Sequence, residues 1–433
     1  MSHIRLLGSG PLPFEASTVH AAAGLRAWQF ARALADEGHR VDLLLLGSRP
    51  TAAGQEPAGG ADLGGIRIHP LEDSYAQSAP ALRALLDEGS PAAVVGASTY
   101  CSYLAARSGA GAPLWIDLNG DPMAEGQARA EAVGDERAVH DAWWMLAWCL
   151  RRGDRFSVVS GAQRYAALGQ LGSAGRLSSR TLGEELVAVI PEACDLPPTP
   201  RAIPSHGEFV ILFSGSFNTW IDGDTLFSAL EIALAANSTL RFVATGGEVA
   251  GFVEEPWRRF AARVESLPEA SRRRIELLGW IPSESLAEVE SRACCGVVPE
   301  RPIVERELGG QNRSLRWMAR GIPVVTTALS EIGASIRSNR LGLVYEPGDA
   351  RSLAEALLLL ESDRSLASEL GSRARAWVGA QRSIAATTAA LRSWSAAPRC
   401  AADRRDGTAD AQSRHQIAML TDQLHLAARE HGV

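Results

Sequence analysis

The sequence predicts an α/β protein of two doubly wound domains, and three observations support this prediction. Short apolar runs alternate with helical patterns from residue 4 to residue 190, and the same alternation starts again at residue 209. Residues 196–207 between them hold four prolines, which is typical of an interdomain linker. A length of 433 residues also suits two domains.

We therefore expect an N-terminal domain over residues 1–195 and a C-terminal domain over residues 205–380. Helices from about residue 380 to residue 433 are expected to cross back to the first domain. Residues 396–410, rich in alanine, arginine and aspartate, are expected to be mobile. Residues 412–430 have the pattern of one helix, which would pack on the body or form a homodimer contact.

Local patterns predict each element of the first half. Residues 41–46 form a continuous apolar run, as in a buried parallel strand. Residues 21–37 have helical apolar spacing and stop at Gly38. The other predicted elements are strands at 4–7, 66–70, 92–95, 114–118, 156–160 and 186–190, and a helix at 82–86.

The second half repeats the strand and helix alternation. Its predicted strands are 209–213, 240–245, 275–278, 296–298, 322–327 and 342–345. Its predicted helices are 224–235, 256–266, 283–291 and 350–361, with further helices over 365–395. Loops that follow the strands of such sheets carry the ligand-binding residues.

Composition excludes several classes of protein. Hydrophobic residues make up 46% and charged residues 21%, as in soluble globular proteins. The net charge of −7 argues against a nucleic-acid partner. The six cysteines show neither zinc spacing nor a disulfide framework, so we expect reduced thiols in a cytoplasmic protein. No signal peptide and no apolar run long enough for a transmembrane segment is visible.

All 43 basic residues counted as lysine or arginine are arginine. Schiff-base chemistry and a P-loop lysine are therefore excluded. Any cationic side chain that binds phosphate must be arginine, which holds oxyanions in a rigid fork. Codon bias in a GC-rich genome explains the missing lysines without a functional cause, and we favour it.

Residues 304–327 contain the most informative motif. Glu305 and Glu307 precede the pair Gly309–Gly310, and a short helix follows that ends at Gly321. A glycine loop that enters a helix presents free backbone N–H groups and the positive end of the helix dipole. Such a loop is suited to a diphosphate, and carboxylates before it could bind the hydroxyls of a sugar.

This order of acid, glycines, helix and Gly-Ile-Pro-Val-Val resembles the donor-site segment of family 4 nucleotide-sugar glycosyltransferases of the GT-B fold. Three further stretches resemble the same family: residues 24–43, 213–222 and 278–282. The resemblance covers most of residues 4–395. It implies two Rossmann-like domains that face each other across a cleft.

The resemblance also implies a reaction and a set of donor-binding residues. The reaction is a retaining sugar transfer from a nucleoside-diphosphate sugar, without a metal or another cofactor. Glu307 would orient the donor sugar. Asn119 and Asp121 are the other two residues predicted to be catalytic. The predicted donor-binding residues are Gly10, Gly215, Ser216, Trp220, Asp222, Gly279, Trp280, Ile281, Gly309, Gly310, Gln311, Asn312, Arg313 and Arg316.

Several positions depart from the family pattern. Arg316 stands where the family has a ribose-binding glutamate, and a guanidinium cannot accept hydrogen bonds from hydroxyls. The family's first glutamate falls on Leu308, so Glu307 matches only with a slip of one residue. Residues 213–222 lack the family's arginine and lysine. Arg313 and Arg316 are therefore predicted to bind the phosphates, although Arg316 also fits a solvent-facing helix position.

His20, Arg26 and Asp117 are predicted to bind the acceptor. Tyr100, Trp143, Trp144 and Trp148 would either wall the acceptor cleft or pack in the core. The expected acceptor is a small molecule with a hydroxyl or thiol, such as a natural-product intermediate. The alternatives are an envelope polysaccharide or glycolipid acceptor, and a catalytically silent sugar-nucleotide-binding protein.

Overall fold

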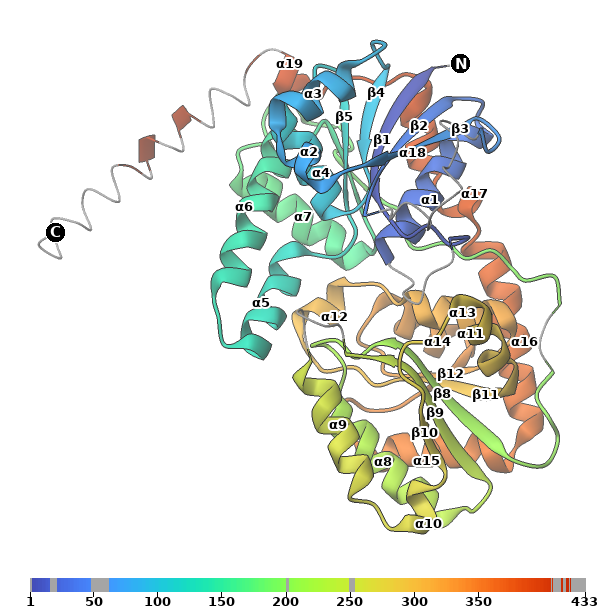
Figure 1. Ribbon diagram of the computed structural model, residues 1–433. Helices are drawn as coiled ribbons and strands as arrows, with labels where there is room; N and C mark the ends of the chain where they lie inside the picture. Colours follow the sequence, from blue (N-terminus) through green and yellow to red (C-terminus); the bar gives the residue numbers. More distant parts are fainter. Residues whose placement is uncertain are drawn as a thin grey trace, which may run out of the picture.

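Two units, each built on one parallel β-sheet, lie one above the other (Figure 1). The computed structural model describes residues 2–15, 22–47, 62–199, 202–248 and 254–405, with residues 407, 414, 415, 418, 419 and 421. The predicted α/β architecture of two doubly wound sheets is confirmed.

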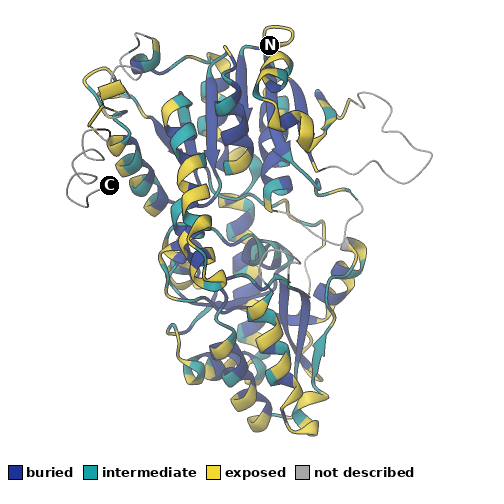
Figure 2. Ribbon diagram, turned by 60° about the vertical axis from the view of Figure 1, so that its left-hand side comes forward, coloured by how far each residue is buried: buried dark blue, intermediate teal, exposed yellow. Residues whose placement is uncertain are grey.

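The N-terminal sheet has seven strands in the order β3-β2-β1-β4-β5-β6-β7. The strands are β1 His3–Ser9, β2 Arg40–Leu46, β3 Ile66–Leu71, β4 Ala93–Gly96, β5 Leu114–Leu118, β6 Arg155–Val158 and β7 Val187–Val189. Apolar runs such as residues 43–46 of β2 are buried on both faces, because helices cover both sides of the sheet (Figure 2).

The C-terminal sheet has six strands in the order β10-β9-β8-β11-β12-β13. The strands are β8 Phe209–Ser216, β9 Leu240–Gly247, β10 Ile275–Leu277, β11 Ala293–Val298, β12 Val324–Thr326 and β13 Gly342–Val344. The strand order reverses between β1 and β4 in one sheet and between β8 and β11 in the other. Open α/β sheets bind ligands at this point, outside the carboxyl ends of the strands.

Helices cover the faces of both sheets. In the N-terminal unit they are α1 Ala22–Asp36, α2 Asp73–Gln77, α3 Ala79–Asp87, α4 Thr99–Ser108, α5 Pro122–Val133, α6 Arg137–Arg152 and α7 Gly161–Ser173. In the C-terminal unit they are α8 Gly223–Ala236, α9 Glu255–Glu265, α10 Glu269–Arg272, α11 Ser283–Arg292, α12 Val304–Leu308, α13 Asn312–Arg320, α14 Glu331–Asn339, α15 Ala350–Ser362 and α16 Arg364–Gln381.

The chain returns to the N-terminal unit after α16. Helices α17 (Ile384–Thr387) and α18 (Ala389–Ala396) lie beside α1 (Figure 1). The short helix α19 (Ala402–Arg405) is anchored by a buried ion pair, in which Asp403 Oδ2 lies 2.6 Å from Arg176 Nε. The prediction that residues 396–410 are mobile is therefore wrong for residues 396–405. Most of the helix predicted at 412–430 lies outside the described residues.

Candidate active site between the two units

Hydrogen bonds join the two units around α12. Ser160 Oγ donates to the Leu308 carbonyl over 2.7 Å, and the Gly161 N–H donates to Glu331 Oε2 over 2.6 Å. Arg301 Nη1 of the C-terminal unit also lies 3.0 Å from Glu131 Oε2 on α5. Helix α12 therefore lies between the units, with α5 and α7 beside it (Figure 1).

The inner face of α12 carries a buried cluster of charges. Arg306 is 4% exposed and donates through Nε and Nη2 to both carboxylate oxygens of Glu305. Its Nη1 lies 3.3 Å from Glu300 Oε1, and its guanidinium lies over the Trp220 ring. Burial raises the pKa of Glu300, although Arg306 and Thr327 favour its charged form. One arginine thus holds two carboxylates below the glycine loop.

The start of α13 is fixed by Gln311, whose side chain is buried. Its Nε2 donates to Glu300 Oε1 over 2.5 Å and to Ser330 Oγ over 2.9 Å, and its Oε1 accepts from Ser314 Oγ. The Gln311 side chain is therefore already hydrogen-bonded within the protein. The first backbone N–H groups of α13 still have no carbonyl of their own helix to bind, so they can serve an anion.

Arg313, in the first turn of α13, has an unused donor group. Its Nη2 donates to the Ser216 carbonyl over 2.9 Å, and its guanidinium lies over the Phe213 ring. Its Nη1 is buried and has no hydrogen-bond partner among the described residues. Burial and the nearby Arg306 lower the pKa of Arg313 to about 10. It stays charged at neutral pH, which leaves an incompletely paired cation facing the Gly215–Ser216 loop.

The N-terminal unit contributes two carboxylates to the same region. Glu192 lies so close to Gly310 that a Cβ there would be 1.5 Å from Glu192 Oε1, so a side chain at position 310 would displace the Glu192 carboxylate. Glu125, on α5, lies over Gly120 in the same way, at 2.1 Å from a Cβ. Burial is the main cause that raises the pKa of Glu192, and burial together with Glu305 raises the pKa of Glu125 to about 8.

The raised pKa of Glu125 gives a testable pH dependence. Between about pH 5 and pH 8 the folded protein keeps a proton on Glu125 that the unfolded chain has lost, so stability should fall as the pH rises. Each unit of pKa shift corresponds to about 1.4 kcal/mol. Glu125→Gln should therefore make the melting temperature less dependent on pH across this range. Glu131→Gln, an exposed change on the same helix, should leave the slope of melting temperature against pH unchanged. Equal slopes for the unchanged protein and both variants would refute the assignment of the raised pKa to Glu125.

The structure corrects the prediction that Arg26 and Asp117 bind the acceptor. Arg26 Nη2 lies 2.7 Å from Asp117 Oδ1, and the two side chains are 1% and 0% exposed. Asp117 also accepts from the Ser98 N–H and from Ser157 Oγ. Both residues are therefore enclosed in the core, with no surface for an acceptor. His20, the third predicted acceptor residue, lies outside the described residues.

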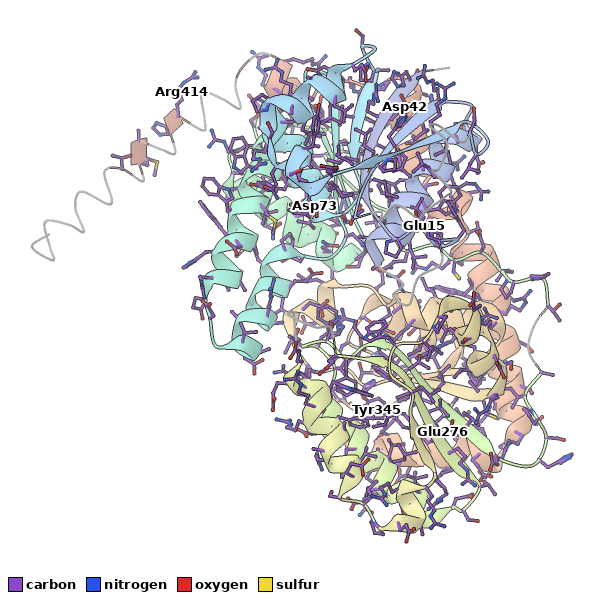
Figure 3. All side chains as sticks on the ribbon, viewed as in Figure 1. Glu15, Asp42, Asp73, Glu276, Tyr345 and Arg414 are labelled. Atoms are coloured by element: carbon purple, nitrogen blue, oxygen red, sulfur yellow. The ribbon has the colours of Figure 1, made fainter. Side chains whose placement is uncertain are left out.

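The other predicted residues of the N-terminal unit lie at strand ends. Asp121 Oδ1 accepts from the Met123 and Ala124 N–H groups and caps α5. Asn119 is partly exposed in the loop before it. Gly10 follows β1, in the same loop as Glu15, which Figure 3 shows at the edge towards the C-terminal unit.

Several predicted donor-binding residues have structural partners. Asp222 caps α8 through the Thr225 N–H, and Trp280 Nε1 donates to the Glu248 carbonyl. The guanidinium of Arg316 pairs with Glu290 of α11, so Arg313 rather than Arg316 faces the Gly215–Ser216 loop. The Gly279 carbonyl, two residues before Ile281, accepts from the Gly246 N–H. Gly309 and Asn312 lie in the donor loop and at the start of α13.

The sequence reasoning missed Glu125, Glu192, Glu300 and Arg306. Glu300 lies two residues after a predicted strand, and this position was a usable signal. Arg306 lies inside the donor motif and binds Glu300 and Glu305 of the same unit, whereas Glu125 and Glu192 reach the region only from the other unit. Glu307, which was predicted to orient the donor sugar, is exposed, while Glu305 is 3% exposed and points to the cluster. Glu305 is therefore the acid of α12 that the cluster holds, and the role of Glu307 in orienting the sugar stays a prediction.

A cavity of about 730 Å³ lies beside this cluster, between α5, α6, α7 and α12. Within the described ranges, no group of three His, Cys, Asp or Glu residues could hold a metal ion. No helix in that part of the chain is long and apolar enough to cross a membrane.

Two family models match the chain. Residues 22–178 match the glycosyl transferase 4-like domain, and residues 208–363 match the glycosyl transferases group 1. No curated protein matches the chain.

Solved structures with a similar fold include sucrose-phosphate synthase from Thermosynechococcus elongatus, at 18% identity and a TM-score of 0.67 over 99% of this chain and 100% of that one. Anabaena HepE in complex with UDP and glucose matches at 16% identity and a TM-score of 0.64, over 91% of this chain and 99% of that one. S. aureus TarM, in complex with UDP and α-GlcNAc-glycerol among others, matches at 11% identity and a TM-score of 0.61, over 91% and 99%.

The two family matches fall on the two units, and the similar structures extend over both sheets and the region between them. The chain belongs to the group 1 and 4-like nucleotide-sugar glycosyltransferases of the GT-B fold.

Proposed function

We propose that the protein moves a sugar from a nucleoside-diphosphate sugar to a small-molecule acceptor, with retention of the anomeric configuration and without a metal. The observation that carries this proposal is the Nη1 of Arg313 at the first turn of α13, which is buried and unpartnered among the described residues. It lies opposite the Gly215–Ser216 loop, where the family has an arginine and a lysine and this chain has neither. A diphosphate placed there would complete the pairing of Arg313.

In the proposed reaction, the acceptor oxygen bonds to the anomeric carbon while the bond from that carbon to the phosphate oxygen breaks. The departing phosphate oxygen takes the proton of the acceptor hydroxyl, so no protein base is required. Negative charge grows on the diphosphate, and Arg313 with the first N–H groups of α13 would stabilise it. This arrangement supplies the positive charge that a metal provides elsewhere.

A thermal-shift screen with nucleoside diphosphates, followed by a donor-hydrolysis assay with the sugar nucleotide of the best base, tests the proposal. Stabilisation by a diphosphate together with hydrolysis of the donor supports a transferase. Stabilisation without turnover would instead support a silent sugar-nucleotide-binding protein. If no nucleoside diphosphate raises the melting temperature, the proposed donor site is wrong.

The two acidic residues of α12 should differ in their effect on turnover. The Glu305 carboxylate lies against Gly309 and holds Arg306, whereas Glu307 is exposed. We expect Glu305→Gln to lower kcat by roughly tenfold, or about 1.4 kcal/mol, because Arg306 loses its bidentate partner below the donor loop. Glu307→Gln is the matched control and should leave kcat nearly unchanged. The opposite order would restore Glu307 as the residue that orients the sugar.

A further inference from the structure

The cavity between α5, α6, α7 and α12 has no role in the donor site. Its volume of about 730 Å³ is large enough for one or two sugar rings. Its walls come from both units, because Val304 and Leu308 of α12 line it together with residues of α5, α6 and α7. The remaining lining residues are Asp121, Met123, Ala124, Gln127, Ala130, Glu131, Glu136, Val139, Ala166 and Gln170.

The polar lining of this cavity is acidic or neutral. Its carboxylates are Asp121, Glu131 and Glu136, its amides are Gln127 and Gln170, and no arginine or histidine of the described ranges lines it. The three carboxylates differ in the hydrogen bonds and ion pairs that they already make within the protein. Asp121 caps α5, and Glu131 is paired with Arg301, whereas Glu136 makes no side-chain capping bond at the start of α6. Glu136 is therefore the carboxylate most available to a ligand.

An exposed indole lies one helical turn beyond Val139, the last residue of α6 that lines the cavity. Trp143 follows Val139 by one helical turn, so the two share a face of α6, and Trp143 is 56% exposed. A helical side chain leans over the turn that precedes it, which places this indole towards Val139. Trp144 is equally exposed at 54%, but it lies about 100° further round the helix and its ring meets Trp148.

Carboxylates, amides and an exposed aromatic ring are the groups that bind a saccharide. Carboxylate and amide oxygens accept hydrogen bonds from hydroxyl or amino groups. The apolar face of a pyranose can cover an indole and remove its surface from water. A phosphate group would meet the carboxylates of Asp121 and Glu136, while the nearby guanidinium of Arg301 is already paired with Glu131, and like charges repel.

We infer that this cavity binds part of the acceptor, that this part is a saccharide unit either neutral or carrying an amine, and that a phosphorylated sugar is rejected. This inference rests on the proposed function for the role of the ligand as acceptor. Glu136 and Gln127 would hold the hydroxyl or amino groups, and Trp143 would cover one face of the ring. The cavity thereby selects between acceptors that the donor site cannot distinguish.

Saturation-transfer NMR on the full-length protein, saturated with the nucleoside diphosphate that binds best, tests the inference. The probes are glucosamine, methyl α-glucoside and glucose 6-phosphate. Glucosamine and the methyl glucoside should receive saturation, and glucose 6-phosphate should receive at least fivefold less. Trp143→Ala should remove the signals, whereas Trp144→Ala, an equally exposed tryptophan on the same helix, should keep them.

A charge reversal at Glu136 gives a second, independent readout. Glu136→Arg should raise the glucose 6-phosphate signal above that of glucosamine. The inference is overturned if glucose 6-phosphate binds the unchanged protein as well as glucosamine does. It is also overturned if Trp143→Ala leaves the signals intact, or if no probe gives a signal that depends on Trp143.

Calorimetry with the nucleoside diphosphate on the same samples separates this test from the proposed function. If the diphosphate does not bind but the saccharide signals depend on Trp143, the donor assignment fails and the saccharide site stands. If the diphosphate binds and the saccharide signals do not follow Trp143 and Glu136, only the acceptor inference fails.

Discussion

Replacing Arg313 with alanine should weaken the binding of a nucleoside diphosphate by about 10- to 150-fold, which corresponds to about 1.5–3 kcal/mol. The reason is that Arg313 Nη1 is buried with no partner in the described part of the chain, while Nη2 is held by the Ser216 carbonyl at the edge of the donor loop. A charged ligand that completes this pairing would form charge-assisted hydrogen bonds in a site shielded from water. Isothermal titration calorimetry measures the loss directly.

The ligand-free protein should respond in the opposite way. Burying an incompletely paired guanidinium costs free energy, so Arg313→Ala should leave the melting temperature of the free protein unchanged or raise it. Arg320→Ala is the matched control, because it removes an arginine from the last turn of the same helix, where Glu290 pairs with it. Diphosphate affinity that survives in Arg313→Ala, or falls equally in Arg320→Ala, would remove the basis of the donor site.

Much of the fold follows from local patterns in the chain. Buried parallel strands such as β8 contain continuous apolar runs, and helices such as α1 end at a glycine that closes them. The short anchor α19 could not be predicted in this way. Its sequence is polar, and it is ordered by a buried ion pair to Arg176, which lies 227 positions earlier in the chain.

The candidate site was predictable only where one segment builds it. The glycine pair, the start of α13 and Arg313 lie in one stretch of sequence, and the structure places Arg313 against the predicted Gly215–Ser216 loop. Glu125 and Glu192 come from the other unit, and no local spacing links them to Gly120 or Gly310. Arg26 and Asp117 show the opposite error, because charged residues that were predicted to bind a ligand form a buried ion pair between α1 and β5.

The second large effect concerns the buried ion pair between Arg26 and Asp117. Arg26→Ala should lower the free energy of unfolding by about 3–5 kcal/mol, since it leaves the Asp117 carboxylate buried without its cation. Arg26 also donates to Gln29 Oε1, so the pair connects α1 with β5. Thermal or denaturant unfolding measures the loss. Arg32→Ala is the matched control on the same helix. Arg32 Nε lies 3.9 Å from Asp36 Oδ1, and this exposed ion pair should contribute about 0–1 kcal/mol.

A double change separates structural support from acceptor binding. Replacing a buried ion pair by neutral groups of similar size is often tolerated, so Arg26→Met combined with Asp117→Asn should recover much of the stability lost in Arg26→Ala. The amide oxygen introduced at position 117 can still accept a hydrogen bond from Ser98 or Ser157, the partners of the Asp117 carboxylate. If the pair only supports the fold, the acceptor KM of the double variant should match that of the unchanged protein. A stable double variant with a strongly raised acceptor KM would instead return Arg26 and Asp117 to the acceptor site, because their buried charges would then act on the ligand.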